Sequence, residues 1–279
     1  MGVLGGGAVH AAMGMSVWSN AVGLISPVGK DFPKYGFNKL GRIFDLQGLQ
    51  QHAVPTPRAW QVYEADGQRT EVFRTDMNQF LDIAPNPALI TGRDFHARGV
   101  HLQCATPEPL LSWIRRLRKL NCGCILWEPW DIYCQAENRD EIYQLLPQVD
   151  VFSPNLIEAQ RISGLIDAEQ IAKILLEEGA RCVAIRMGEA GSLVADKEGT
   201  HFWIPVAPVE GIIDVTGAGN AYCGGFLVGY AETGDPLQAA RKGSVSASFA
   251  LEQFGAVYPI RGLAEKAAAR LSYLESMSK

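Results

Sequence analysis

The chain has 279 residues, of which 47% are hydrophobic and 20% are charged, and its formal net charge is −5. These proportions are typical of a globular protein and exclude a disordered chain, a collagen and a multi-span membrane protein. Because 30 Asp and Glu residues outnumber 25 Lys and Arg residues, the chain lacks the basic surplus of a nucleic-acid-binding protein. We therefore expect a single α/β domain over residues 1–279 that binds neither nucleic acid nor a membrane.

The cysteines and the N-terminal segment indicate a reducing compartment. Six cysteines are scattered along the chain without a C-x-x-C pair, so neither a zinc site nor a disulfide framework is indicated. Residues 1–29 carry no charge, but no basic segment precedes them and seven glycines interrupt them, which argues against a signal peptide. We expect buried free thiols and a cytoplasmic protein.

The first half of the chain contains a glycine-rich start and a hairpin signal. Residues 5–8 (GGGA) lead into a predicted helix. Between residues 57 and 73, two β-rich stretches meet at Asp66-Gly67, which is the strongest short signal for a β-hairpin. The pattern fits both a flap that projects from the body and an ordinary hairpin at a sheet edge.

The second half alternates helical periodicity with short apolar runs, which favours a parallel sheet with helices on both faces. The expected helices span 108–120, 141–146 and 167–178, the expected strands span 124–127, 149–152 and 182–186, and three further helices span 216–231, 236–253 and 262–274.

The segment 212–220 is the most informative stretch of the sequence. A short apolar run, expected to be a strand, leads into Gly217-Ala218-Gly219 and then into a helix. This pattern directs unpaired backbone N–H groups of a helix N-terminus at one point, which suits a phosphate. A turn that uses glycine for geometry alone is the alternative. Gly224, Gly225 and Gly229 inside the helix indicate that another part of the chain comes close to it.

Residues 214–220 (DVTGAGN) closely resemble the signature D-T-T-G-A-G-D of the ribokinase-like (PfkB) carbohydrate kinases. Four further segments resemble motifs of that family, in the family's order: 5–8 with Gly29-Lys30-Asp31, Thr56-Pro57-Arg58 with the hairpin, 155–158 (N-x-x-E), and 188–191. The resemblance implies a ribokinase-like three-layer α/β sandwich with a mostly parallel sheet. It also implies an inserted β-lid at about 48–76, through which such proteins form homodimers.

The resemblance further implies ATP with Mg²⁺ as cofactor, a sugar or nucleoside as acceptor, and a role for each matching residue. The residues expected beside the nucleotide are Asn155, Arg186, Gly188, Gly191, Thr216, Gly217 and Gly219. The catalytic set is Gly217, Ala218, Gly219 and Asn220, and the acceptor set is Gly6, Gly7, His10, Asp31 and Asn220. Glu158 is expected to order the water shell of Mg²⁺, and Asp214 to lie at a monovalent cation such as K⁺.

Each of these roles has a plain structural alternative. Asn155 has the sequence context of a helix cap, with Glu158 facing solvent. Arg186 fits a surface charge at the end of a strand, and Asp214 fits the cap of a turn.

The residue at position 220 departs from the family pattern. The family holds there the carboxylate that takes the proton of the acceptor hydroxyl, and the carboxamide of Asn220 cannot accept it at neutral pH. A general base contributes typically about 10² to 10⁴-fold, whereas phosphoryl transfer depends mainly on positioning and electrostatics. The sequence resembles a eukaryotic killer-maintenance branch of the family that has the G-x-G-N form, and an engineered Asp-to-Asn change would look the same. Two functions stay open: a kinase of low or unconventional activity, and a catalytically silent nucleotide- or sugar-binding regulator.

Other departures concern the acceptor site. Met1 lies four residues before Gly5, so we expect the family's first strand, which carries a sugar-binding Asp, to be missing. His10 stands where the family often has Asn, and Glu128-Pro129 stands in for Asp-Pro. A dinucleotide-binding fingerprint at 5–8 is a further alternative, but His10 occupies the place of its third small residue.

Overall fold

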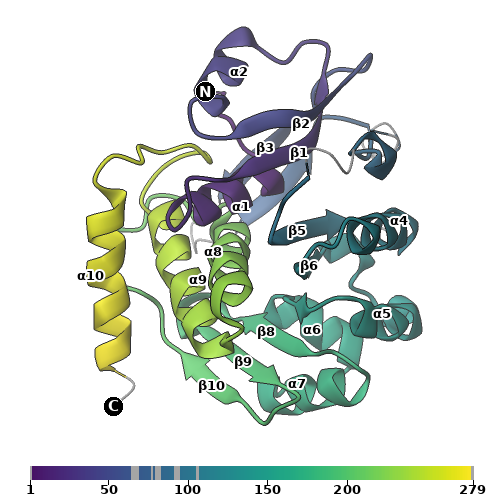
Figure 1. The fold of residues 1–279 in the computed structure, drawn as a ribbon, viewed down its shortest axis with the longest axis vertical. Coiled ribbons are helices and arrows are strands. Elements are labelled where there is room, and N and C mark those ends of the chain that lie inside the picture. The colour runs from purple at the N-terminus through teal and green to yellow at the C-terminus, as the bar shows by residue number, and fades with distance from the viewer. Residues whose placement is uncertain are drawn as a thin grey trace. The chain divides into compact units, whose positions relative to one another are not determined.

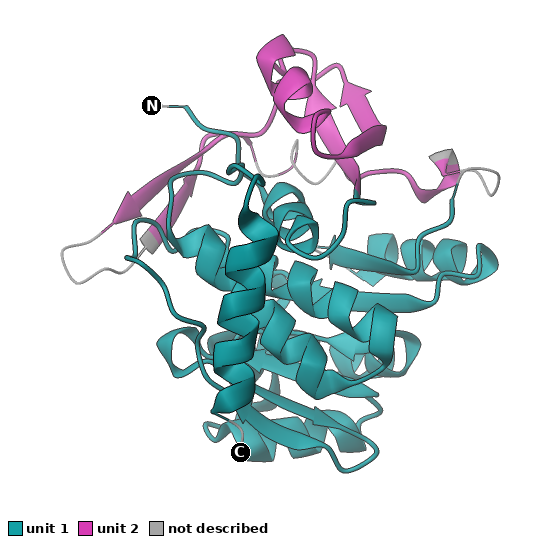
Figure 2. Ribbon diagram, turned by 60° about the vertical axis from the view of Figure 1, so that its left-hand side comes forward, with its two compact units in different colours: residues 1–22, 91–279 teal, residues 23–90 magenta. Residues whose placement is uncertain are grey.

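The computed structural model describes residues 2–63, 69–76, 78, 83–90, 95–104 and 107–277. The chain divides into two compact units, one formed by residues 1–22 and 91–279 and the other by residues 23–90 (Figure 2). Among the described residues, no helix is long and apolar enough to span a membrane.

The larger unit contains a six-stranded sheet in the order β10-β9-β8-β7-β6-β5. Its strands are β5 (Gly99–Cys104), β6 (Cys124–Pro129), β7 (Val151–Phe152), β8 (Cys182–Arg186), β9 (Ser192–Asp196) and β10 (His201–Ile204). Strands β5 to β8 run parallel, and β9 and β10 join antiparallel at one edge. The mostly parallel sheet predicted from the sequence is therefore confirmed.

Helices cover both faces of this sheet, with α8 and α9 on one side and α4 to α7 on the other (Figure 1). The helices of the larger unit are α1 (Gly7–Ser16), α4 (Pro107–Lys119), α5 (Arg139–Leu145), α6 (Leu156–Ser163), α7 (Ala168–Glu177), α8 (Ala218–Thr233), α9 (Pro236–Leu251) and α10 (Leu263–Ser276). Short 3-10 turns span Asp131–Tyr133, Ala136–Asn138, Leu146–Gln148 and Gly188–Ala190. The predicted helices are thus observed, with bounds that shift by at most two residues.

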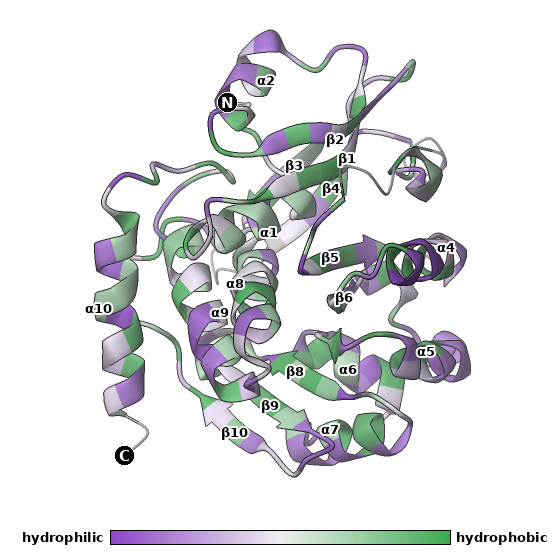
Figure 3. Ribbon diagram, viewed as in Figure 1, coloured by the Kyte–Doolittle hydropathy of each residue, from purple (hydrophilic) through white to green (hydrophobic). Residues whose placement is uncertain are grey.

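One part of the core lies between the sheet and α8. The middle strands are buried on both faces, so their sequences are continuous apolar runs, which appear green in Figure 3. Leu126 and Ala184 pack in one cluster with Tyr222, Cys223 and Phe226 of α8. Five of the six cysteines are buried and Cys104 is half-buried, and all six are free thiols.

The glycines of α8 let neighbouring helices approach closely. A Cβ at Gly224 would overlap the carbonyl oxygen of Ala11 in α1, and a Cβ at Gly229 would lie 2.7 Å from the Cα of Ala239 in α9. A close neighbour, expected from the glycines in the sequence, is therefore confirmed. The close neighbour of Gly224 is α1, and the close neighbour of Gly229 is α9.

The expected strand at 212–215 is wrong. The backbone N–H groups of Ile213 and Asp214 donate to the carbonyl oxygen of Leu251, at 2.8 and 3.2 Å, instead of pairing with a strand. Leu251 is the last residue of α9, and its carbonyl needs a donor from outside the helix. The segment therefore caps a helix end, and Ile212 and Ile213 are exposed.

The smaller unit holds a two-stranded parallel sheet of β1 (Gly23–Gly29) and β2 (Asp45–His52), the helix α2 (Lys34–Leu40), and a 3-10 turn at Pro87–Leu89. It also holds an antiparallel hairpin of β3 (Ala59–Tyr63) and β4 (Arg69–Phe73), which confirms the two predicted hairpin strands. The expected turn at Asp66-Gly67 lies outside the described residues. That 48–76 acts as a lid stays a prediction.

The packing of α8 predicts a cost for a single methyl group. Gly224→Ala should lower the free energy of unfolding by about 1–3 kcal/mol, because its Cβ would force α1 and α8 apart. This loss should exceed the helix-propensity gain of about 1 kcal/mol. Urea unfolding measures it, with Gly211→Ala as control because nothing lies within 4 Å of a Cβ there. Equal stability of the two variants would contradict this packing.

Candidate active site

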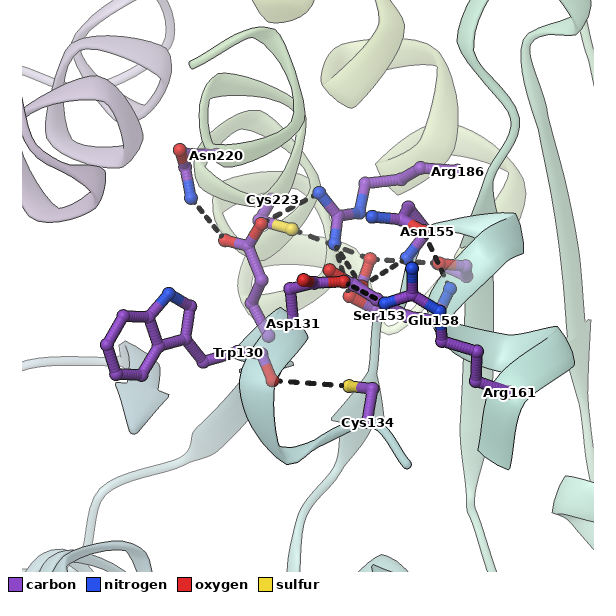
Figure 4. A network of polar contacts seen from close by, with 12 residues as sticks. Trp130, Asp131, Cys134, Ser153, Asn155, Glu158, Arg161, Arg186, Asn220 and Cys223 are labelled. Atoms are coloured by element: carbon purple, nitrogen blue, oxygen red, sulfur yellow. Dashed lines mark hydrogen bonds and ion pairs between the residues drawn. The ribbon is translucent and has the colours of Figure 1, made fainter. Parts of the chain in front are cut away.

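A buried polar cluster lies at the carboxyl ends of β6 and β8, where parallel sheets commonly bind ligands (Figure 4). Glu128 is the last residue but one of β6, and Arg186 is the last residue of β8. Asn220 extends toward them from the first turn of α8. Strand and helix geometry thus brings three distant parts of the sequence to one point.

Glu128 is the centre of the cluster. Its Oε1 lies 2.7 Å from Arg186 Nη1, and its Oε2 lies 2.7 Å from His101 Nε2 and accepts from Asn220 Nδ2 at 2.9 Å. The side chain is only 4% exposed. Burial raises the pKa of Glu128, but the ion pair with Arg186 and the contacts with His101 and Asn220 outweigh burial and hold it at about 2. Glu128 is therefore ionised at neutral pH and fully engaged.

Arg186 also contacts the residue that follows β7 and a residue in the first turn of α6. Its Nη2 donates to the carbonyl oxygen of Ser153 at 2.9 Å and lies 3.5 Å from Glu158 Oε2. The alternative of a surface charge at Arg186 is wrong, because its side chain is 12% exposed and pairs with buried carboxylates.

Asn155 and Glu158 form a reciprocal cap at the start of α6. Asn155 Oδ1 accepts from the backbone N–H of Glu158 at 2.8 Å, and Glu158 Oε2 accepts from the backbone N–H of Asn155 at 2.7 Å. The helix-cap interpretation of Asn155 is therefore correct. The solvent-facing alternative for Glu158 is wrong, because the residue is 6% exposed and faces Arg186. Burial raises the pKa of Glu158 to about 7 despite the opposing effect of Arg186.

The start of α8 requires glycine for two reasons. Gly217 has a φ of 77°, in the left-handed region that favours glycine, and a Cβ there would overlap the imidazole of His10. A Cβ at Gly219 would overlap Nη1 of Arg186. The loop therefore lies directly against His10 and Arg186, while Ala218 opens the helix whose N-terminal N–H groups can bind an anion.

The start of α1 lies beside Asn220 as well. A Cβ at Gly7 would lie 3.2 Å from Asn220 Nδ2 and would overlap Gln103 Oε1. Gly6 is the N-cap of α1, with a φ of 94°. The structure thus brings Gly7, His10 and Asn220 of the expected acceptor set together.

The remaining predicted residues lie in turns. Gly188 and Gly191 flank the turn between β8 and β9 with φ of 59° and 85°, and a Cβ at Gly191 would overlap the carbonyl oxygen of Ile204. Asp214 Oδ1 accepts from the backbone N–H of Thr216 at 2.8 Å, so the turn-cap interpretation of Asp214 describes its geometry.

Asp31 belongs to the smaller unit. Its Oδ1 accepts from the backbone N–H of Thr56 at 2.6 Å and its Oδ2 pairs with Arg58 Nη2 at 2.7 Å. The hydrogen bonds from Thr56 and Arg58 hold the pKa of Asp31 well below its usual range. Within its own unit, Asp31 therefore joins the end of β1 to the segment before β3.

Sequence reasoning missed His101 and the central role of Glu128. The strand β5 that carries His101 was not predicted, and Glu128 was noted only as a departure from a motif. A polar residue at the carboxyl end of an apolar strand was the available signal. Ligand atoms of His101, Glu128 and Cys223 lie within 4.8 Å of one another, but the guanidinium of Arg186 supplies the positive charge that balances Glu128.

The chain is similar to known proteins in sequence and in fold. The sequence model described as pfkB family carbohydrate kinase matches residues 3–261. A cytidine kinase of Thermococcus kodakarensis is 31% identical over 253 residues, covering 90% of this chain and 88% of the relative. Protein MAK32 of Saccharomyces cerevisiae is 29% identical over 289 residues, covering 91% of this chain and 78% of the relative.

A solved structure supports the fold. The crystal structure of a putative ribokinase II from E. coli in complex with ATP and Mg²⁺ superposes with a TM-score of 0.76 at 20% identity, covering 95% of this chain and 89% of that chain. The ribokinase-like α/β fold predicted from the sequence is confirmed.

The buried Glu158 predicts a specific pH dependence of stability. Its pKa of about 7 lies above the 4.5 of a Glu in the unfolded chain, so its contribution to stability is present below pH 4.5 and is lost as pH rises through 7. Glu158→Gln keeps the cap but cannot ionise. Relative to the parent, it should therefore gain on the order of 3 kcal/mol in unfolding free energy between about pH 4.5 and 8.

Urea unfolding across this pH range tests the expectation. Glu177→Gln is the control, because Glu177 is exposed and pairs with the exposed Lys173 at 3.9 Å. Parallel profiles of Glu158→Gln and the parent would rule out a raised pKa at Glu158.

Proposed function

The chain belongs to the pfkB family of carbohydrate kinases, and we propose that it transfers the γ-phosphoryl group of ATP to a hydroxyl of a nucleoside or sugar. The observation that carries the proposal is the N-terminus of α8, where Gly217 and Gly219 lie against His10 and Arg186 and next to Asn220. The cytidine kinase relative, which covers 90% of this chain, favours a nucleoside as acceptor.

Backbone N–H groups at the start of α8 supply the charge stabilisation that the transferred phosphoryl group needs. They point along the helix axis, and the helix dipole adds to their partial positive charge. We assign the nucleotide to Asn155, Arg186, Gly188, Gly191 and the loop at 216–219. The acceptor is assigned to Gly6, Gly7, His10 and Asn220, and the role of Asp31 stays an expectation from the resemblance.

The acidic residues fit a hydrated Mg²⁺ that arrives with the nucleotide. Mg²⁺ usually keeps several waters and takes one or two carboxylates besides the phosphates. Glu128 is committed to Arg186, whereas Glu158 has a raised pKa of about 7, so a nearby dication would favour its ionised form. Glu158 would hold the water shell of the ion, which would neutralise phosphate charge.

Three further assignments remain proposals. A monovalent cation beside Asp214 follows from the resemblance, although the bond to Thr216 accounts for the orientation of Asp214 without an ion. Homodimerisation through 48–76 and a cytoplasmic location likewise follow from the family and the composition.

A second function is favoured by one residue. Asn220 cannot take a proton from the acceptor, and a protein with this site could bind nucleotide without turnover. The similarity to MAK32 over 91% of the chain is consistent with the killer-maintenance branch that the sequence resembles.

Phosphoryl transfer separates the two functions. The protein with Mg-ATP should convert at least one acceptor of a panel of cytidine, adenosine, ribose and fructose to its monophosphate, detected by mass spectrometry. Nucleotide binding without product on any acceptor would favour the silent function. Failure to bind Mg-ADP at millimolar concentration would contradict both.

The loop at 217 should be essential for nucleotide affinity. Gly217→Ala should weaken Mg-ADP binding at least tenfold by calorimetry, because a Cβ displaces His10 and strains a left-handed residue. Gly199→Ala is the matched control, since Gly199 also has a positive φ of 93° but nothing lies within 4 Å of its Cβ. Equal affinity of the two variants would place the phosphates elsewhere.

A further inference from the structure

The hydrogen bond between Asn220 and Glu128 fixes which end of the Asn220 amide faces the active site. Glu128 has a pKa of about 2, so its carboxylate only accepts hydrogen bonds. The amide nitrogen of Asn220 must therefore face Glu128, at 2.9 Å, and its carbonyl oxygen must point away (Figure 4). The opposite orientation would place two oxygen acceptors in contact.

The side chain of Glu128 is held in one orientation by its three partners. Its side chain is 4% exposed, and its two oxygens face Arg186, His101 and Asn220 at 2.7 to 2.9 Å. With a pKa of about 2 it is a poor proton acceptor. Glu128 is therefore suited to orient Asn220 and unsuited to replace it as a base.

The start of α1 also lies beside the nitrogen of the Asn220 amide. A Cβ at Gly7 would lie 3.2 Å from Asn220 Nδ2, so the start of α1 packs against this side chain. The start of α1 carries Gly6, Gly7 and His10, which we assign to the acceptor. The amide nitrogen of Asn220 is therefore held between Glu128 and the start of α1.

We infer that Glu128 and Asn220 act as one unit, in which Glu128 is a positioning residue that presents Asn220 Oδ1 to the acceptor hydroxyl as a neutral hydrogen-bond acceptor. This inference rests on the proposed kinase function. The acceptor oxygen forms a bond to the γ-phosphorus of ATP, and the bond from that phosphorus to ADP breaks, with ADP keeping the electron pair. The hydroxyl proton passes to an oxygen of the transferred phosphoryl group, because the cluster offers no unpaired carboxylate.

The unit explains why a carboxylate at position 220 alone would be unfavourable. Asn220→Asp would place two carboxylate oxygens about 2.9 Å apart, where one proton is shared and the pKa of the pair rises. Exchanging both groups, as Glu128→Gln with Asn220→Asp, keeps one carboxylate, one amide and the bond between them, while Arg186 Nη1 then faces a neutral carboxamide oxygen in place of the carboxylate. Only the double variant gives position 220 a free carboxylate oxygen at neutral pH.

Four proteins test the unit: the parent, Asn220→Asp, Glu128→Gln and the double variant. With Mg-ATP and the acceptor panel, the double variant should exceed each single variant at least tenfold in kcat/KM. If Asn220→Asp alone equals the double variant, the two positions are independent and the inference is wrong.

Thermal unfolding from pH 4 to 8 tests the pairing without any turnover. A carboxylate pair with a raised pKa stabilises the fold at low pH and loses this stabilisation as pH rises. The midpoint of Asn220→Asp should therefore fall relative to the parent by about 5 °C or more across the range, and the double variant should not show this fall. A parallel profile of Asn220→Asp and the parent would overturn the pairing.

The kinetic measurement tests the kinase function, and the unfolding measurement tests the pairing of Glu128 with Asn220. If all four proteins bind Mg-ADP and none phosphorylates any acceptor, the kinase function fails, while the unfolding profiles still decide whether Glu128 and Asn220 are paired.

Discussion

The buried ion pair between Glu128 and Arg186 is the contact on which the rest of the site depends. Removing either charge from water is costly, and only a close partner with further hydrogen bonds compensates for it. Arg186 therefore lies across the ends of β6 and β8 and also contacts Glu158 and the carbonyl oxygen of Ser153. Through Glu128, the same pair orients Asn220. Two strands and two helices are thus joined by one guanidinium group.

The glycine loop at the start of α8 follows from this arrangement. A phosphate cradle needs exposed backbone N–H groups, and a tight neighbour needs the absence of a Cβ. Gly217 and Gly219 meet both needs, because His10 and Arg186 fill the space that side chains would take. The geometric and the anion-binding interpretations of the loop are therefore compatible, and the geometric one explains why alanine is accepted only at position 218.

Local patterns in the sequence were sufficient to predict the layers of the fold, but they were not sufficient to predict the contacts of the site. Alternating periodicity predicted the parallel sheet, while β5 was missed because His101 and Gln103 interrupt its apolar pattern. The strand expected at 212–215 was wrong, since an apolar run does not reveal that its amides cap α9. The burial of Glu158 was unpredictable, because it depends on Arg186, which arrives from another strand. Glu128 was visible in the sequence, but its three partners come from positions 27 to 92 residues away.

A crystal structure with a non-hydrolysable ATP analogue, Mg²⁺ and cytidine is the most direct test of this account. It should place the γ-phosphate at the start of α8 and keep Glu128 paired with Arg186 and with Nδ2 of Asn220. Asn220 Oδ1 should then lie about 3 Å from the acceptor hydroxyl. A complex in which Glu128 leaves Arg186 and binds the hydroxyl itself would contradict the account, as would a γ-phosphate bound away from residues 217–219.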